Sequence, residues 1–232
     1  MRTLLIETST SEGAVGLAAG TRLVARKQLS QARRHARDLI PAIGQLLDEA
    51  GWAPRSIELV IVDRGPGSYT GLRVGIMTAK TFCYATGAML VGGCAADILA
   101  HAASDDALSV ATLIDAQKGN IYARHFTRTG AGEPLEPTSE LAVVDAKEWL
   151  ATLPEGTLVT GPALDRFADV VPATLRTTEE GRRYPELSSL LGIGRSSCDA
   201  GRRDDPWGLE PTYLRPSEAE ERWRQRHGAD AS

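Results

Sequence analysis

The sequence predicts an α/β fold of two lobes, each opening with a β-hairpin on a mixed sheet that helices flank. An apolar segment at residues 3–7, a turn rich in hydroxyl side chains and a second apolar segment at 14–19 form a hairpin pattern. The same pattern returns at 108–127. After the first hairpin, short β-branched segments alternate with helical patterns, which indicates parallel strands joined by crossover helices.

The composition is that of a globular chain in a reducing compartment. The 232 residues are 42% hydrophobic and carry a formal net charge of −4, which argues against unaided wrapping of nucleic acid. The three cysteines form no C-x-x-C pair. The first apolar segment contains Glu7, which is not typical of a signal peptide. We therefore expect a cytoplasmic protein with no membrane contact.

The first lobe is expected to follow the order βββαβαβα. Its first helix is amphipathic, because apolar residues from Leu39 to Ala50 recur at helical spacing before Gly51, and Pro41 lies near its beginning or kinks it. The predicted strands are 3–7, 14–19, 23–28, 59–63 and 89–91, and the predicted helices are 39–51, the segment from the loop after residue 63 to about 87, and 97–103.

A polar segment at 104–106 separates the lobes. The second lobe is predicted to contain strands at 108–114, 121–127 and 158–160, a short helix behind Asp145, a helix from Leu164 and a helix from Pro185 to Leu191. The predicted domain bounds are 1–105, 106–215 and a charged tail at 216–232.

The central strand ends in a loop of Gly65, Pro66 and Gly67, here called the Gly-Pro-Gly loop, and Ser68 or Thr70 can cap the helix that follows. The loop lacks the lysine of a phosphate-binding P-loop, and its glycines are spaced one residue too far apart for the dinucleotide fingerprint. It also lacks the G-x-S-x-G pattern of a hydrolase nucleophile. Three common chemistries are therefore unsupported here.

Within that helix Gly71, Gly75 and Ala79 recur at i, i+4 and i+8, so one face is almost bare of side chains. A bare face permits close approach of another backbone. It can pack on the sheet of the same chain or on a second protein, and the helical period is the same in both cases.

Two hairpin-led lobes with parallel strands and crossover helices resemble the actin, sugar kinase and Hsp70 (ASKHA) superfamily. Four segments more narrowly resemble the TsaB (YeaZ) family. They are residues 5–10 (LIETST), 64–73 (RGPGSYTGLR), 115–122 (DAQKGNIY) and 211–215 (PTYLR). The second segment is the most specific, and the resemblance extends from residue 1 to about 215.

This resemblance implies a bacterial cytoplasmic protein required for threonylcarbamoyladenosine in tRNA, at the adenosine next to the anticodon. It implies a non-catalytic subunit that binds and activates its catalytic paralogue TsaD together with the ATPase TsaE, and that meets tRNA only within this complex. The two helices around the Gly-Pro-Gly loop would contact TsaD or a second copy of the chain. The implied interface residues are His35, Leu39, Gly67, Tyr69, Gly71, Leu72, Gly75 and Ala79.

The sequence shows no catalytic equipment of the paralogue. The paralogue binds its metal through two histidines one helical turn apart, whereas none of the four histidines here has another histidine four residues away. We therefore expect no catalytic residue, no metal and no cofactor.

A remnant nucleotide site is the basis of an alternative function, a small ATP-dependent phosphotransferase of the same superfamily. Its residues would be Glu7, Asp115 and Gly119. Glu7 stands where the superfamily pattern has aspartate, and Gln117 and Lys118 would crowd a phosphate in the second hairpin turn. A third hypothesis is direct tRNA binding through the arginine pairs at 33–34 and 202–203.

Overall fold

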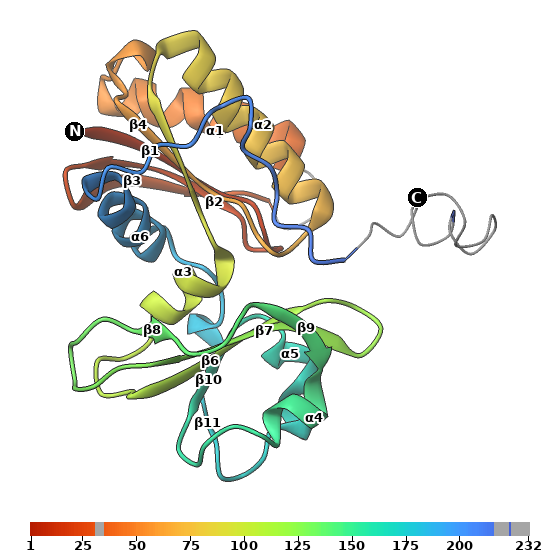
Figure 1. The fold of residues 1–232 in the computed structure, drawn as a ribbon. Helices are drawn as coiled ribbons and strands as arrows, with labels where there is room; N and C mark the ends of the chain where they lie inside the picture. Colours follow the sequence, from red (N-terminus) through yellow and green to blue (C-terminus); the bar gives the residue numbers. More distant parts are fainter. Residues whose placement is uncertain (31–34, 216–222, 224–232) are drawn as a thin grey trace.

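The computed structural model describes residues 1–30, 35–215 and 223, with the side chains of residues 35 and 36 outside the description. It contains two lobes, each built on a mixed β-sheet (Figure 1). The predicted 216–232 tail and the Arg33-Arg34 pair lie outside the described residues, apart from Trp223. None of the helices formed by the described residues combines the length and the apolar character that a bilayer crossing requires.

The first sheet has five strands in the order β3-β2-β1-β4-β5. β1 pairs antiparallel with β2 and parallel with β4, and β4 pairs parallel with β5. The strands are β1 (Arg2–Glu7), β2 (Ala14–Ala19), β3 (Arg22–Gln28), β4 (Leu59–Asp63) and β5 (Met89–Gly93). All five residues of β4 are buried, as expected for a central strand covered on both faces.

Helices cover both faces of this sheet (Figure 1). α1 (His35–Ala50) and α2 (Tyr69–Thr86) pack on the face that carries Leu4 and Ile6, while α6 (Leu187–Asp199) packs on the face that carries Leu5. α6 follows the second sheet in the sequence but returns to the first lobe, so the predicted range 106–215 includes one helix that packs on the first sheet.

The second sheet has the order β11-β10-β6-β7-β8, and β9 also pairs with β7. As in the first sheet, an antiparallel hairpin of β6 and β7 is extended by parallel strands. α3 packs on one face and α4 and α5 on the other. The elements are α3 (Ala95–His101), β6 (Ser109–Asp115), β7 (Asn120–Thr127), β8 (Glu136–Pro137), β9 (Ala142–Asp145), α4 (Ala146–Leu150), β10 (Leu158–Thr160), α5 (Leu164–Phe167) and β11 (Arg176–Thr177), with 3-10 turns at Pro54–Ser56, Ala168–Val170 and Glu180–Arg182.

The predicted element order is confirmed, except that α6 is longer than predicted and three short strands, β8, β9 and β11, were not predicted. The helix predicted at 185–191 begins at Leu187 and continues to Asp199, past two glycines. A Cβ atom at Gly194 would overlap the side chain of Ile61, so that glycine allows α6 to approach β4 closely. β9 was not predicted, because only its pairing with β7 distinguishes this short half-buried segment from a loop.

The bare face of α2 packs against the turn between β1 and β2 in the same chain. Ser68 N donates to Ser9 O at 2.7 Å, and Thr8 Oγ1 donates to Gly71 O at 2.8 Å. A Cβ atom at Gly71 would overlap the Thr8 carbonyl oxygen, and one at Gly75 would overlap the Thr8 side chain. The glycine face of α2 therefore packs within its own chain. The structure also confirms the Ser68 cap, whose Oγ accepts from Gly71 N at 3.3 Å.

We predict that Gly71→Ala destabilises the protein by about 2 kcal/mol or more, because an added methyl group forces the Thr8 carbonyl away from α2. Gly44→Ala is the matched control. Gly44 also lies in a helix, but nothing stands within 4 Å of its Cβ position, so alanine there should stabilise by about 0.5–1 kcal/mol. Urea unfolding of both variants measures the difference. Equal stability of the two variants would contradict the close packing.

Candidate functional site

A cleft of about 880 Å³ lies between the lobes. Each of the four segments that carry the family resemblance contributes to its lining, although they lie far apart in the sequence. The first segment supplies Ser9 and Thr10, and the others supply residues including Tyr69, Asp115 and Tyr213. This convergence could not be predicted from the spacing of the segments, since it depends on how the two lobes face each other.

Glu7 lies beneath this cleft and is not part of its lining. Its side chain is fully buried, and Oε1 accepts from Ser9 N at 2.7 Å and from Ser9 Oγ at 2.6 Å, while Oε2 has no hydrogen-bond partner among the described residues. Burial, with a smaller contribution from the nearby Asp63 carboxylate, raises the pKa of Glu7 to about 8. Glu7 is therefore mainly protonated at neutral pH, which makes it a poor ligand for a metal-bound nucleotide.

Asp63, at the end of β4, is the second fully buried acid in this region. Burial raises its pKa to about 6, and its Oδ1 accepts from Gly65 N at 2.7 Å. The carboxylate thus holds the beginning of the Gly-Pro-Gly loop through the backbone.

Asp115 does line the cleft, on the turn between β6 and β7. Its Oδ1 accepts from Gln117 N at 2.7 Å, and Oδ2 forms an ion pair with Arg166 Nη1 at 3.3 Å. The turn contains three consecutive residues of positive φ, Gln117 at 63°, Lys118 at 53° and Gly119 at 85°. Of the predicted nucleotide-site residues, only Asp115 faces the cleft, and it is already paired with an arginine of its own lobe.

The structure gives no metal-ligand group in the part of the chain that it describes. Across residues 1–30 and 37–215, no three histidine, cysteine, aspartate or glutamate side chains are grouped so that they could hold an ion. His125 instead lies on β7, with Nε2 2.8 Å from Ser109 Oγ and Nδ1 2.9 Å from Thr138 Oγ1.

The residues predicted for the partner interface differ in how far they are exposed. Most of them are buried inside the chain, so they cannot present side chains to a partner in this conformation. The buried residues are Leu39, Gly71, Leu72, Gly75 and Ala79. Tyr69 is 38% exposed, and Gly67 is half-buried in the cleft lining. His35 is the first residue of α1, and its side chain lies outside the described residues.

The opposite face of α2 is exposed and carries large apolar side chains that the sequence analysis missed. Met77 is 57% exposed and Tyr84 is 75% exposed. Two aromatic residues from the segment that follows α6 extend this face, since Tyr213 stacks on Tyr69 with ring centroids 5.1 Å apart, and Trp207 meets Tyr84 edge to face at 5.5 Å. We call the set Tyr69, Met77, Tyr84, Trp207 and Tyr213 the aromatic ridge.

Polar contacts fix the segment 205–213 along α2. Lys80 Nζ donates to Trp207 O at 3.0 Å and to Leu209 O at 3.2 Å. The Arg73 guanidinium lies 4.2 Å above the Tyr69 ring, and its Nε donates to Tyr213 Oη at 3.1 Å. The ridge is therefore preorganised by its own chain.

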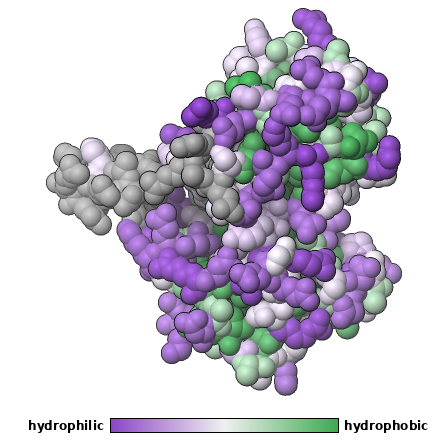
Figure 2. Space-filling view, turned by 180° about the vertical axis from the view of Figure 1, so that it is seen from behind, coloured by the Kyte–Doolittle hydropathy of each residue, from purple (hydrophilic) through white to green (hydrophobic). Residues whose placement is uncertain are grey.

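On the face seen in Figure 2, by comparison, hydrophilic residues predominate and hydrophobic residues form small patches.

The paired hairpin-led sheets, with α3 and α6 between the lobes, define the class of this protein as the ASKHA fold. A solved structure titled YeaZ from Pseudomonas aeruginosa superposes with a TM-score of 0.78, at 23% identity over 92% of this chain and 99% of that chain. This likeness shows the fold.

Sequence comparison identifies the family. A family model described as "TsaD: tRNA N6-adenosine threonylcarbamoyltransferase" matches residues 22–186. The chain is 26% identical to "tRNA threonylcarbamoyladenosine biosynthesis protein TsaB" of Bacillus subtilis over 96% of this chain and 98% of that protein. It is 28% identical to "tRNA N6-adenosine threonylcarbamoyltransferase" of Thermomicrobium roseum, over 70% of this chain but only 37% of that protein. The chain therefore belongs to the TsaD family and, within it, to the TsaB (YeaZ) group.

We predict that the stability of the protein falls as the pH rises from about 4.5 to about 8, in part because of Glu7. The pKa of Glu7 is higher in the folded state than its ordinary value of 4.5, so the folded state holds the proton more tightly than the unfolded state. Ionisation of Glu7 then costs up to about 1.4 kcal/mol of folding stability per pH unit in that window. Glu7→Gln keeps a neutral side chain and should flatten the profile.

Urea unfolding at a series of pH values measures this effect. Glu180→Gln, which removes an exposed carboxyl, is the control and should retain the wild-type profile. A Glu7→Gln profile that falls as steeply as the wild type would show that Glu7 is ionised in the folded protein.

Proposed function

We propose that this chain is a non-catalytic subunit that supports threonylcarbamoyladenosine formation in tRNA, next to the anticodon, by binding and activating a TsaD-type transferase together with a TsaE-type ATPase. The observation that carries the proposal is the likeness to a protein named for tRNA threonylcarbamoyladenosine biosynthesis over nearly the whole of both chains. The aromatic ridge supplies a surface for the partner.

Two observations support the non-catalytic part of the proposal. The chain aligns with 98% of the TsaB relative but with only 37% of the transferase relative, so its likeness to the TsaB relative is the more complete of the two. In addition, the acid at the end of β1, Glu7, is buried and mainly protonated at neutral pH.

The same placement of Glu7 argues against the phosphotransferase alternative. That function needs an ionised carboxylate beside the nucleotide phosphates, whereas Glu7 lies beneath the Ser9 backbone and does not line the cleft. Asp115 alone remains in the cleft, with its charge opposed by Arg166.

The ridge has the properties of a docking surface. Tyrosine and tryptophan contribute large contact areas to interfaces, and methionine adapts to the partner's shape. The buried glycine face anchors α2 against the Thr8–Ser9 turn, so the exposed face needs little ordering when it binds. We therefore place the interface on the outer face of α2 instead of on the buried residues of this helix. A homodimer would use the same outer face.

Contact with tRNA is assigned to the assembled complex. The guanidinium of Arg203 donates to Cys198 O at 2.6 Å, and Arg202 pairs with Asp204 at 3.3 Å, so this arginine pair already serves contacts within the chain. A net charge of −4 also makes strong binding of tRNA by the isolated chain unfavourable.

We predict that Met77→Arg and Tyr84→Ala each weaken binding to the TsaD-type protein of the same organism by about 30-fold or more, because interface side chains of this kind contribute about 2 kcal/mol or more each. Isothermal titration calorimetry measures the affinity. The control is Leu108→Arg, which places the same charge on a side chain that is 51% exposed in the second lobe and should not change binding.

The reconstituted modification reaction provides the second readout. Adding the wild-type chain should raise threonylcarbamoyladenosine formation by the transferase, and Met77→Arg should reduce this gain in parallel with the affinity. Unchanged affinity in both ridge variants would reject the ridge as the interface. Modification of tRNA by this chain without the transferase would reject the non-catalytic role.

A further inference from the structure

A second cavity, of about 640 Å³, lies between the lobes and is separate from the cleft described above. Its walls are the end of β5, the helices α3 and α6, the side of β7 that faces α3 and the loop at 132–135. Four arginines line it, Arg64, Arg124, Arg128 and Arg202. Neither the family likeness nor the proposed function gives this cavity a role.

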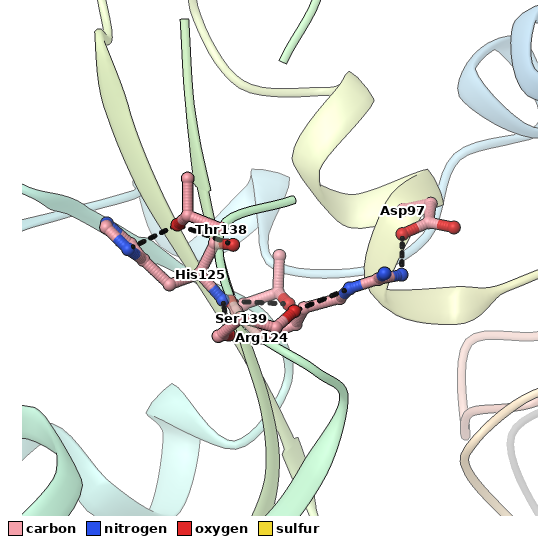
Figure 3. Close-up of polar contacts among 6 residues, drawn as sticks. Asp97, Arg124, His125, Thr138 and Ser139 are labelled. Atoms are coloured by element: carbon pink, nitrogen blue, oxygen red, sulfur yellow. Dashed lines mark hydrogen bonds and ion pairs between the residues drawn. The ribbon is translucent and has the colours of Figure 1, made fainter. Parts of the chain in front are cut away.

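Two of these arginines have carboxylate partners within the chain. Arg124 extends from β7 to Asp97 on α3, where Nη1 and Oδ1 are 2.8 Å apart (Figure 3). Arg202 donates to the Gly92 carbonyl oxygen and forms an ion pair with Asp204 at 3.3 Å. The charges of this half of the cavity are therefore balanced.

Arg128 is poorly paired. Its side chain is only 6% exposed, yet the carboxylate nearest to it, Asp105, is 88% exposed and lies 3.9 Å from Nη1. Nη2 makes a long hydrogen bond of 3.4 Å to Ser104 O, and the buried Nε has no acceptor among the described residues. A buried guanidinium with such weak partners is costly unless another anion satisfies it.

Arg64 is the second poorly paired arginine. It follows β4 and belongs to the Gly-Pro-Gly segment, and its aliphatic part lies against Gly92. Its buried Nε has no acceptor among the described residues. Burial raises the pKa of Asp97 and of Asp63, and Arg64 only partly offsets this rise. Both acids have other partners, since Asp97 binds Arg124 and Asp63 accepts from Gly65 N. The remaining acid in the lining, Glu133, is on an exposed loop.

We infer that this cavity binds a small molecule through an oxyanion, a phosphate or a carboxylate group, held by Arg64 and Arg128. A guanidinium offers parallel N–H donors that match both kinds of anion. The volume lies within the range typical of small-molecule sites. An anion here would offset the charges of two weakly paired guanidiniums, one from each lobe.

Inorganic phosphate and acetate are the probes, titrated separately into the full chain at constant ionic strength with chloride as the balancing ion. Backbone amide NMR shifts locate the binding in the wild-type protein without mutation. We expect saturable shifts at Gly92, Gly93 and Cys94, which line the cavity, with either or both probes. A response to phosphate alone identifies phosphoryl ligands, and a response to acetate alone identifies carboxylates.

Arg64→Gln should weaken binding of the responding probe by about tenfold or more, because it removes a charged donor. Arg166→Gln is the matched control. It removes an arginine that pairs with Asp115 in the lining of the other cleft, and it should leave the affinity unchanged.

The inference is overturned if neither probe gives saturable shifts, if the shifts fall on Gly67 to Tyr69 in the other cleft, or if Arg64→Gln binds as tightly as the wild type. Since the NMR titration uses the isolated wild-type chain, its result does not depend on complex formation.

Discussion

The packing of the glycine face of α2 against the Thr8–Ser9 turn determines much of the rest of this structure. Because Gly71 and Gly75 have no side chains, the helix comes close enough for Thr8 Oγ1 to donate to Gly71 O and for Ser68 N to donate to Ser9 O. This contact fixes the direction of α2. The glycine face is then buried, and the side chains on the opposite face form the exposed ridge with residues from the segment after α6.

The same turn covers Glu7. Two hydrogen bonds from Ser9 hold the Glu7 carboxyl in a fully buried site beside Asp63, where the ionised form is unfavourable. In a phosphotransferase, this position would need an ionised carboxylate that reaches the cleft. Here the acid accepts hydrogen bonds from the turn against which α2 packs, so the end of β1 serves packing and, indirectly, the proposed docking surface. This arrangement is consistent with a subunit that acts through a partner.

Local patterns in the sequence predicted most of the fold, and the site depended on contacts that they do not contain. The alternation and helical periods gave the order of the strands and helices, because each depends on neighbouring residues only. The direction of the glycine face could not be predicted, since its period is the same against a sheet or a partner. Trp207 and Tyr213 join the ridge across more than a hundred residues of sequence, with Arg73 and Lys80 as the links. Of the ridge residues, Tyr69 was among those predicted for the interface, and Met77 and Tyr84, opposite the glycines on α2, were the local signal that was overlooked.

Hydroxyl-radical footprinting can locate the docking surface, by comparing oxidation of this chain alone and in complex with the TsaD-type protein. If the outer face of α2 is the docking surface, oxidation of Met77 and Tyr84 should fall several-fold in the complex, while Leu108 in the second lobe should react as before. A complex in which Met77 and Tyr84 react as in the free chain would contradict the account, because the partner would then bind elsewhere.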